Sequence, residues 1–176
     1  TYTDLHTGKP TRATQLNERE WRTLIKTVHR AADIVTKEFG LKLLFEPHSD
    51  SHVENEEQIE AFLNETDPNG VSLMLDTGHH INKAGDPIDF ICRHHKRIPY
   101  FHLKNINPRV QKMFQEGKVS FSTAVGMGLW SEPSQGPLNF VGLRELLNKI
   151  NWEGWAVIEQ GMYPAPLDKP LPIAKR

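Results

Sequence analysis

Four short hydrophobic runs in this chain each end in a side chain that can bind a metal ion. The runs cover residues 43–46, 73–76, 98–102 and 155–159, and stretches with helical spacing separate them. A strand that delivers a polar side chain at its carboxyl end is how parallel α/β folds build their active sites. Four such ends in succession are hard to explain by chance, so we expect them to share one site. The four polar residues are Glu46, Asp76, His102 and Glu159.

The expected strands carry no polar alternation, which is typical of parallel strands covered on both faces. They span residues 41–45, 71–75, 98–101 and 155–158. Helices are expected to begin at Asn17, Asn55, Asp86 and Phe140. Asn17 and Asn55 resemble capping boxes, because Glu or Gln follows each of them three residues later. The alternation of helices and strands predicts a parallel α/β fold.

Residues 105–137 interrupt this alternation. The segment holds helical pieces at 110–116 and 121–125, followed by a loop at 130–137. Long insertions after such strands are often lids or substrate walls. The tail at 162–176 contains four prolines and is expected to be extended.

The number of strands predicts half of a closed fold. Four β/α units are half of an eight-stranded (β/α)8 TIM barrel, which takes about 250 residues. Alone, they would leave two open sheet edges. We therefore expect residues 1–176 to be a single domain, the C-terminal half of a TIM barrel, with about 100 residues preceding Thr1 absent. A dimer of half-barrels is the alternative.

Composition excludes several classes of partner. The formal net charge of −1 gives no general electrostatic reason to bind nucleic acid or an anionic membrane. No apolar run approaches the ~20 residues that span a bilayer. Residues 1–12 lack the apolar segment of a signal peptide. Cys92 is the single cysteine and suits a reducing compartment, so a cytoplasmic location is expected.

Four sequence motifs resemble one known superfamily. They are Phe-Glu-Pro-His at 45–48, Leu-Asp-Thr-Gly-His at 75–79, Phe-His-Leu-Lys-Asn at 101–105 and Val-Ile-Glu-Gln at 157–160. Together they resemble the xylose-isomerase-like sugar isomerase/epimerase superfamily, over about residues 17–176. Glu46 matches its epimerase branch, whereas the insertion looks most like the inosose dehydratase branch.

The resemblance implies roles for the four strand-end residues. Glu46, Asp76, His102 and Glu159 would bind a divalent metal ion, which suits three carboxylates and an imidazole. Mn²⁺ is the expected ion, with Mg²⁺, Co²⁺ and Zn²⁺ as alternatives. Glu46 and Glu159 would also serve as the catalytic acid/base pair. The ion would stabilise the enediolate that forms when the carbon next to a ketone loses its proton.

Five further residues are candidates for substrate binding. In the family, a histidine at the position of His79 contacts the substrate or the outer shell of the metal. His48 and His52 follow Glu46 on the same loop, and Lys104 shares the strand face of His102. Arg109 is a candidate anchor by spacing. For each of these residues an ordinary loop or surface position is the alternative.

The expected function is a divalent-metal-dependent sugar isomerase or epimerase of carbohydrate metabolism. It would act on a ketose or related polyol ketone through an enediolate. A lyase of the inosose dehydratase type is the alternative. Two further alternatives are DNA repair of the endonuclease IV kind, which needs a basic groove, and a non-catalytic sugar-binding module. The expected partner is a small sugar or inosose, and homo-oligomerisation is left open.

Overall fold

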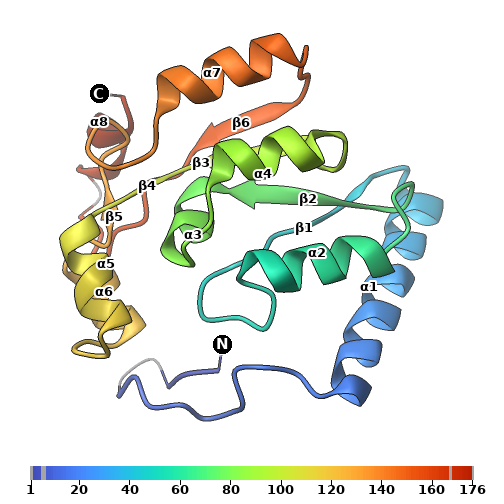
Figure 1. Cartoon of the computed structure of the whole chain (residues 1–176), viewed down its shortest axis with the longest axis horizontal. Helices are drawn as coiled ribbons and strands as arrows, with labels where there is room; N and C mark the ends of the chain where they lie inside the picture. The colour runs from blue at the N-terminus through green and yellow to red at the C-terminus, as the bar shows by residue number, and fades with distance from the viewer. Residues whose placement is uncertain (1, 5–6, 167, 176) are drawn as a thin grey trace.

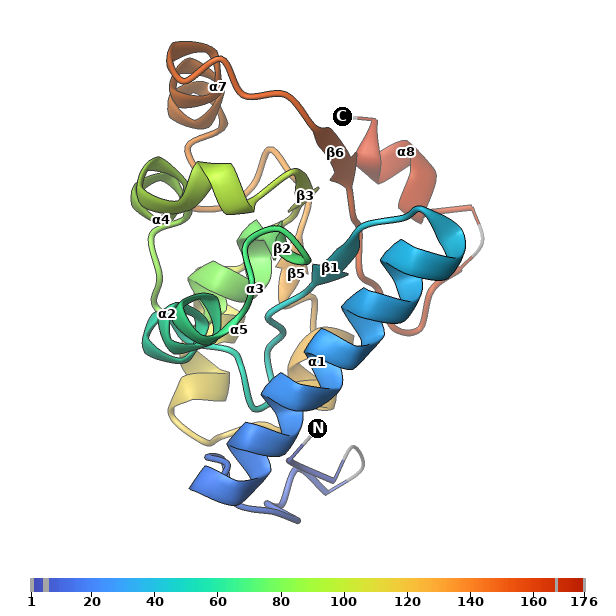
Figure 2. The same ribbon diagram turned by 90° about the vertical axis from the view of Figure 1, so that its right-hand side faces the viewer.

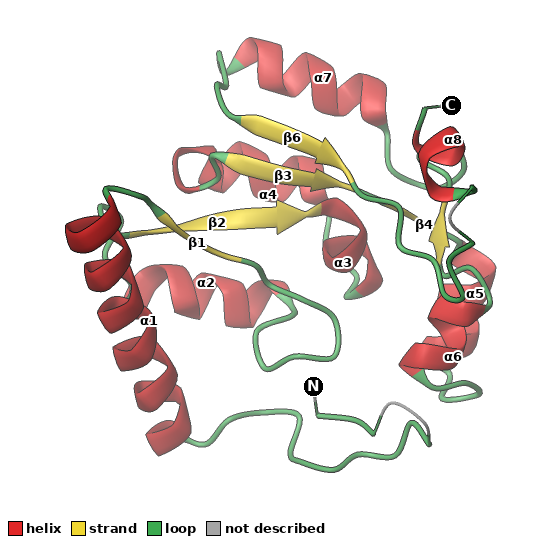
Figure 3. Cartoon of the chain, turned by 180° about the vertical axis from the view of Figure 1, so that it is seen from behind, coloured by secondary structure: helices red, strands yellow, loops and turns green. Residues whose placement is uncertain are grey.

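A single parallel sheet organises the chain. The structure is a computed structural model that describes residues 2–4, 7–166 and 168–175. The sheet has the order β1-β2-β3-β6, and all neighbouring strands are parallel. Its strands point the same way (Figure 3). The strands are β1 (Leu43–Phe45), β2 (Val71–Asp76), β3 (Tyr100–Leu103) and β6 (Trp155–Ile158).

The long helices cover one face of this sheet. Figure 2 shows α2, α4 and α7 stacked along one side of the strands, and Figure 1 shows α1 running past β1. Their apolar faces share one core with the strands. In the described part of the chain, no helix is long and apolar enough to cross a membrane. The helices are α1 (Glu18–Phe39), α2 (Glu56–Glu65), α4 (Pro87–His94) and α7 (Phe140–Lys149).

Strand register sorts the side chains into a packed and an open face. Phe45 pairs with Leu73, and Leu75 pairs with Phe101; all four belong to the core beneath the helices or pack against it. Residues of opposite parity, including the partly exposed Val157, lie on the other face. A parallel sheet covered by helices on one face, with its other face open, is what half of a TIM barrel would form.

The predicted helix starts are confirmed. Asn17 accepts a hydrogen bond from Glu20 N while the Glu20 side chain accepts from Asn17 N. Asn55 and Gln58 form the same reciprocal pair at α2. Helix α1 ends at Gly40, whose φ of 63° is a left-handed conformation that glycine adopts without a Cβ clash.

The insertion forms a small subdomain beside the carboxyl ends of the strands. Strands β4 (Asn105–Ile106) and β5 (Trp130–Ser131) pair antiparallel around α5 (Pro108–Gln115) and α6 (Phe121–Gly126). The sequence predicted the two helical pieces but not this ribbon. A second apolar cluster fills it, formed by Ile106, Val110, Ala124, Leu129 and Trp130.

Three short helical turns complete the described structure. Helix α3 (Thr77–Asn82) follows β2 directly, and η1 (His95–Arg97) precedes β3. The tail departs from the prediction of an extended segment, because α8 (Pro170–Ala174) forms there. Proline at the first helical position needs no hydrogen bond partner for its nitrogen, so it can begin a helix.

Candidate metal centre

The four strand-end side chains meet at one point. One ligand atom from each of Glu46, Asp76, His102 and Glu159 lies within 4.8 Å of each of the others. Parallel pairing explains this, because it brings the carboxyl ends of neighbouring strands to one edge of the sheet (Figure 3). Asp76 lies opposite His102 in the register, and Glu159 N donates to Leu103 O at 3.1 Å.

His102 lies at the centre of the cluster. Its Nδ1 is 2.8 Å from Glu159 Oε2, 3.1 Å from Glu46 Oε1 and 3.7 Å from Asp76 Oδ2. One imidazole nitrogen therefore faces all three carboxylates. Three carboxylates around one nitrogen concentrate negative charge where a cation would be stabilised.

This donor set fits a divalent ion. Ligands at about 2.0–2.3 Å from a metal lie at most about 4.6 Å from one another, close to the spacing found here. Carboxylate oxygens with an imidazole suit Mn²⁺, Mg²⁺ or Zn²⁺. Asp76 Oδ2 is buried, and the Lys104 ammonium lies 3.0 Å from it. A carboxylate oxygen has more than one acceptor site, so it can also take a ligand bond.

Asp76 is fixed by its position at a helix start. Its Oδ1 accepts a hydrogen bond of 2.8 Å from His79 N, which makes Asp76 the N-cap of α3. One carboxylate oxygen is thus engaged by the helix, while the other is directed to the cluster. The short α3 therefore positions a metal-ligand candidate as well as linking β2 to the next segment.

Lys104 supplies a buried positive charge beside the cluster. Its Nζ lies 3.0 Å from Asp76 Oδ2 and 3.1 Å from Glu159 Oε2, and the side chain is 3% exposed. Gly78 makes room for it, because a Cβ there would lie 2.7 Å from Lys104 Cγ. Thr77 Oγ1 donates to Lys104 O at 2.7 Å and holds the backbone.

The two carboxylates around Lys104 titrate differently. Burial raises the pKa of Asp76, although the Lys104 charge opposes this. At Glu159, partial burial would raise the pKa, but the charges of Lys104 and His102 outweigh it and lower the pKa. The lowered pKa keeps the Glu159 carboxylate ionised at neutral pH.

His79 and His48 adjoin the cluster as a pair of packed rings tilted by 37°. Their ring centroids are 3.7 Å apart. Ser49 N donates to His79 Nδ1 at 3.2 Å, and Lys104 Nζ lies 3.4 Å from His79 Nε2. Burial lowers the pKa of His79 well below its usual value, with Lys104 adding to the effect. His79 is therefore a neutral imidazole next to the metal-ligand candidates.

Among the described residues, no contact joins His52 or Arg109 to the four clustered side chains, and their role in substrate binding stays a prediction. His52 Nδ1 lies 3.3 Å from Thr14 O, and its ring is 6.0 Å from that of Tyr2. Arg109 is exposed on the first turn of α5. Asp50, in the loop between Glu46 and His52, has a φ of 64°.

Trp130, at the start of the loop expected at 130–137, packs against two residues beside the cluster. Its ring centroid is 4.7 Å from that of His79, and Lys104 Nζ lies 4.8 Å from it. The indole is 6% exposed, so it is both a packed aromatic and a wall of the site. Trp130 pairs with Ile106 across the β4–β5 ribbon. Each of these strands has only two residues, which is too short for a periodic pattern in the sequence to predict the pairing.

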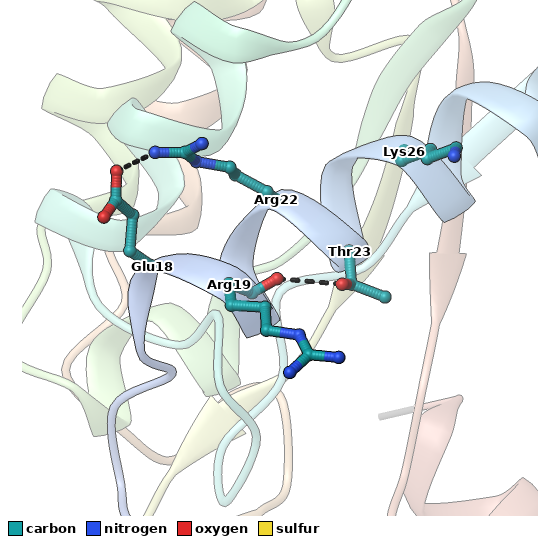
Figure 4. A pocket seen from close by; sticks show the side chains of 5 residues that line it. All are labelled: Glu18, Arg19, Arg22, Thr23 and Lys26. Atoms are coloured by element: carbon teal, nitrogen blue, oxygen red, sulfur yellow. Dashed lines mark hydrogen bonds and ion pairs between the residues drawn. The ribbon is translucent and has the colours of Figure 1, made fainter.

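A separate hollow lies on α1, away from these residues. Figure 4 shows that it is lined by side chains from the first turns of the helix. Arg22 forms an ion pair with Glu18, and the Thr23 hydroxyl donates to Arg19 O at 2.8 Å. These groups satisfy one another on an open surface, and we assign no function to the hollow.

Comparison with known proteins identifies the family. The family model described as the xylose isomerase-like TIM barrel matches residues 1–174. The chain therefore belongs to this family. Its parallel sheet and covering helices are the corresponding part of the barrel.

Among curated proteins, the chain is similar to inosose dehydratases. It is 35% identical over 151 residues to the enzyme of Geobacillus kaustophilus (strain HTA426), covering 86% of this chain and 49% of that protein. It is 33% identical over 148 residues to the enzyme of Clostridium tetani (strain Massachusetts / E88), covering 84% and 49%. The chain thus spans about half the length of these relatives.

Solved structures agree on the fold. The probable 3-DHS dehydratase AsbF of Bacillus anthracis superposes with a TM-score of 0.67 at 17% identity, covering 82% of this chain and 52% of that one. The IOLI protein, solved with a zinc atom, gives a TM-score of 0.66 at 18% identity, covering 94% and 58%. At these identities the likeness shows the fold alone.

Proposed function

We propose that the protein carrying this chain is a divalent-metal-dependent lyase that removes water from a cyclic polyol ketone, as an inosose dehydratase does. The observation that carries the proposal is the convergence of Glu46, Asp76, His102 and Glu159 within 4.8 Å. The inosose dehydratases at 30–35% identity support a lyase over the isomerase or epimerase expected from the motifs. The zinc atom in the IOLI structure supports a metal at this site.

The four convergent side chains would hold the ion. When bound, it would supply a Lewis acid that stabilises negative charge on the substrate's ketone oxygen. Mn²⁺ is our first choice, with Mg²⁺, Co²⁺ and Zn²⁺ as alternatives.

Glu159 is the proposed base. Its pKa is lowered and its side chain is 42% exposed, so the carboxylate is ionised and accessible. It would take the proton from the carbon next to the ketone. Glu46, on the opposite edge strand of the sheet, would hold the proton that the departing hydroxyl needs.

The surroundings of this pair would orient the substrate. Lys104 and His79 are buried on the Asp76 side and carry nitrogens suited to hydrogen bonds with hydroxyl groups. The His48 ring packs against that of His79 and extends the same wall. His52 and Arg109 are not part of the proposal, because no contact among the described residues joins them to the cluster.

Epimerisation or isomerisation is the second candidate. Glu46 favours it, because its position in the cluster matches the glutamate of the epimerase branch. Both reactions begin with removal of the same proton and differ in the next step. Elimination expels a hydroxyl group, whereas isomerisation returns the proton to carbon.

The products distinguish the two reactions. We would load the intact protein with Mn²⁺ and supply a keto-inositol. A lyase should produce an ultraviolet-absorbing enone or diketone, and an isomerase a product of unchanged mass and little absorbance. An unchanged substrate after Mn²⁺, Mg²⁺, Co²⁺ and Zn²⁺ have all been tried would contradict the lyase proposal.

A further inference from the structure

Glu159 directly follows β6, which lies at one edge of the described sheet and pairs there with β3. The chain spans about half the length of its curated relatives, so the exposure of this edge says nothing about how firmly β6 is held in the whole protein. The contacts made by the residues directly after Glu159 do bear on the direction of its carboxylate.

Two contacts fix the chain directly after Glu159, and Trp130 makes both. Gln160 Nε2 donates to Trp130 O at 3.2 Å. Gly161 lies against the indole, because a Cβ there would come within 2.6 Å of Trp130 Cδ1. Gly161 is therefore needed at this position for space, as any side chain would push the strand end away from the indole.

The same indole supports the cation that binds Glu159. Lys104 Nζ lies 4.8 Å from the Trp130 ring centroid and 3.1 Å from Glu159 Oε2. A lysine ammonium over an aromatic face is held by the ring's negative quadrupole. Trp130 thus contacts both the backbone after Glu159 and its charged partner.

Trp130 is itself held rigidly. It pairs with Ile106 across the β4–β5 ribbon and packs in the apolar cluster of the insertion. We infer that Trp130 is a positioning residue, which sets the direction of Glu159 through its contact with Gly161. The inference rests on the proposed metal centre but not on the reaction that the centre catalyses.

Metal affinity tests this inference without a substrate. Mn²⁺ binding to the intact protein would be measured by calorimetry for Gly161→Ala and Trp130→Ala. Each should weaken binding by about tenfold or more, the scale for partners that orient metal ligands. Trp130→Phe should restore most of the affinity, because it keeps an aromatic face. If Trp130→Ala does not fold, the Mn²⁺ affinity of Gly161→Ala still tests the inference.

Trp152 provides a matched control at the other end of β6. Its indole donates to Ile98 O at 2.7 Å and packs on Phe101. Trp152→Ala should lower the melting temperature but leave Mn²⁺ affinity unchanged. A loss of affinity in this control equal to that in Trp130→Ala would show a general packing effect and overturn the inference.

A double-mutant cycle tests the route through Glu159. In a Glu159→Gln background, Gly161→Ala should add little further loss, because the two changes act on one ligand. Fully additive losses of Mn²⁺ affinity would overturn the inference about Trp130 but not the proposed metal centre. Wild-type affinity in both Gly161→Ala and Trp130→Ala would do the same. Absence of Mn²⁺ binding in the wild-type protein would overturn the metal centre and this inference with it.

Discussion

Lys104 Nζ lies 3.1 Å from Glu159 Oε2, and the lysine is the more deeply buried partner of the pair. The same ammonium is 3.0 Å from Asp76 Oδ2. Without a metal ion, Lys104 is thus the positive charge that stabilises two of the three clustered carboxylates. A bound dication would share this role.

Lys104→Met should destabilise the metal-free protein more than the metal-loaded protein. Removing one partner of a buried ion pair costs about 3 kcal/mol or more, and the exposure of Glu159 places the effect at the lower end. Melting curves with and without saturating Mn²⁺ should therefore show a larger metal-induced rise for the variant than for the wild type. Lys112→Met, at an exposed position, serves as the control. Equal rises in all three proteins would show that Lys104 does not act as the counter-charge.

Asp76→Asn should weaken metal binding before it affects chemistry. The amide keeps the N-cap to α3 through its oxygen, so the fold is retained. It removes a negative ligand, and activity should return partly when excess Mn²⁺ is added. The measurement is enzyme activity as a function of Mn²⁺ concentration. Activity that stays low at saturating metal would place Asp76 in the chemical step.

Gly78→Ala should displace the Lys104 side chain. The added Cβ would lie 2.7 Å from Lys104 Cγ and 2.9 Å from its Cδ. Overpacking of this kind costs about 1–3 kcal/mol. Urea unfolding should report a loss of stability. Gly70→Ala is the matched control, because its Cβ would meet Ala32 Cβ at an ordinary 3.7 Å. Equal losses in the two variants, or no loss in Gly78→Ala, would refute the prediction.

His80 should make stability depend on pH. Burial lowers its pKa from the usual 6.5, although Glu56 opposes this, so folding favours the neutral ring. Its contribution to stability is therefore complete above pH 6.5 and is lost as the pH falls below that value toward the folded pKa. Urea midpoints between pH 7.5 and 5 should fall less steeply for His80→Gln than for the wild type. Parallel slopes would contradict the assignment.

The parallel sheet and its four polar strand ends could be predicted from the sequence because their signals are local. An unalternating apolar run marks a buried strand, and the carboxyl ends of such strands meet by geometry. The shared site could therefore be predicted without knowing which strands pair. Its four members are Glu46, Asp76, His102 and Glu159. The helix starts at Asn17 and Asn55 were equally local, as each depends on a side chain three residues away.

The surroundings of the cluster depended on contacts that the sequence does not reveal. Trp130 meets Lys104 only because two-residue strands pair across the insertion, and so short a strand has no periodicity. Asp50 adopts a positive φ in the loop between Glu46 and His52, and no local pattern in the sequence marks that turn. The burial of Lys104 depends on Gly78, which the sequence alone could not connect with it.

Proton removal at the carbon next to a ketone is the central claim, and deuterium exchange tests it most directly. The intact protein with Mn²⁺ would be incubated with a keto-inositol in D₂O, and label at that carbon would be followed by NMR. Exchange should occur in the wild type and fall about 10²-fold or more in Glu159→Gln, the scale of losing a general base. Undiminished exchange in Glu159→Gln, or none in the wild type with any inosose or ketose, would contradict the account.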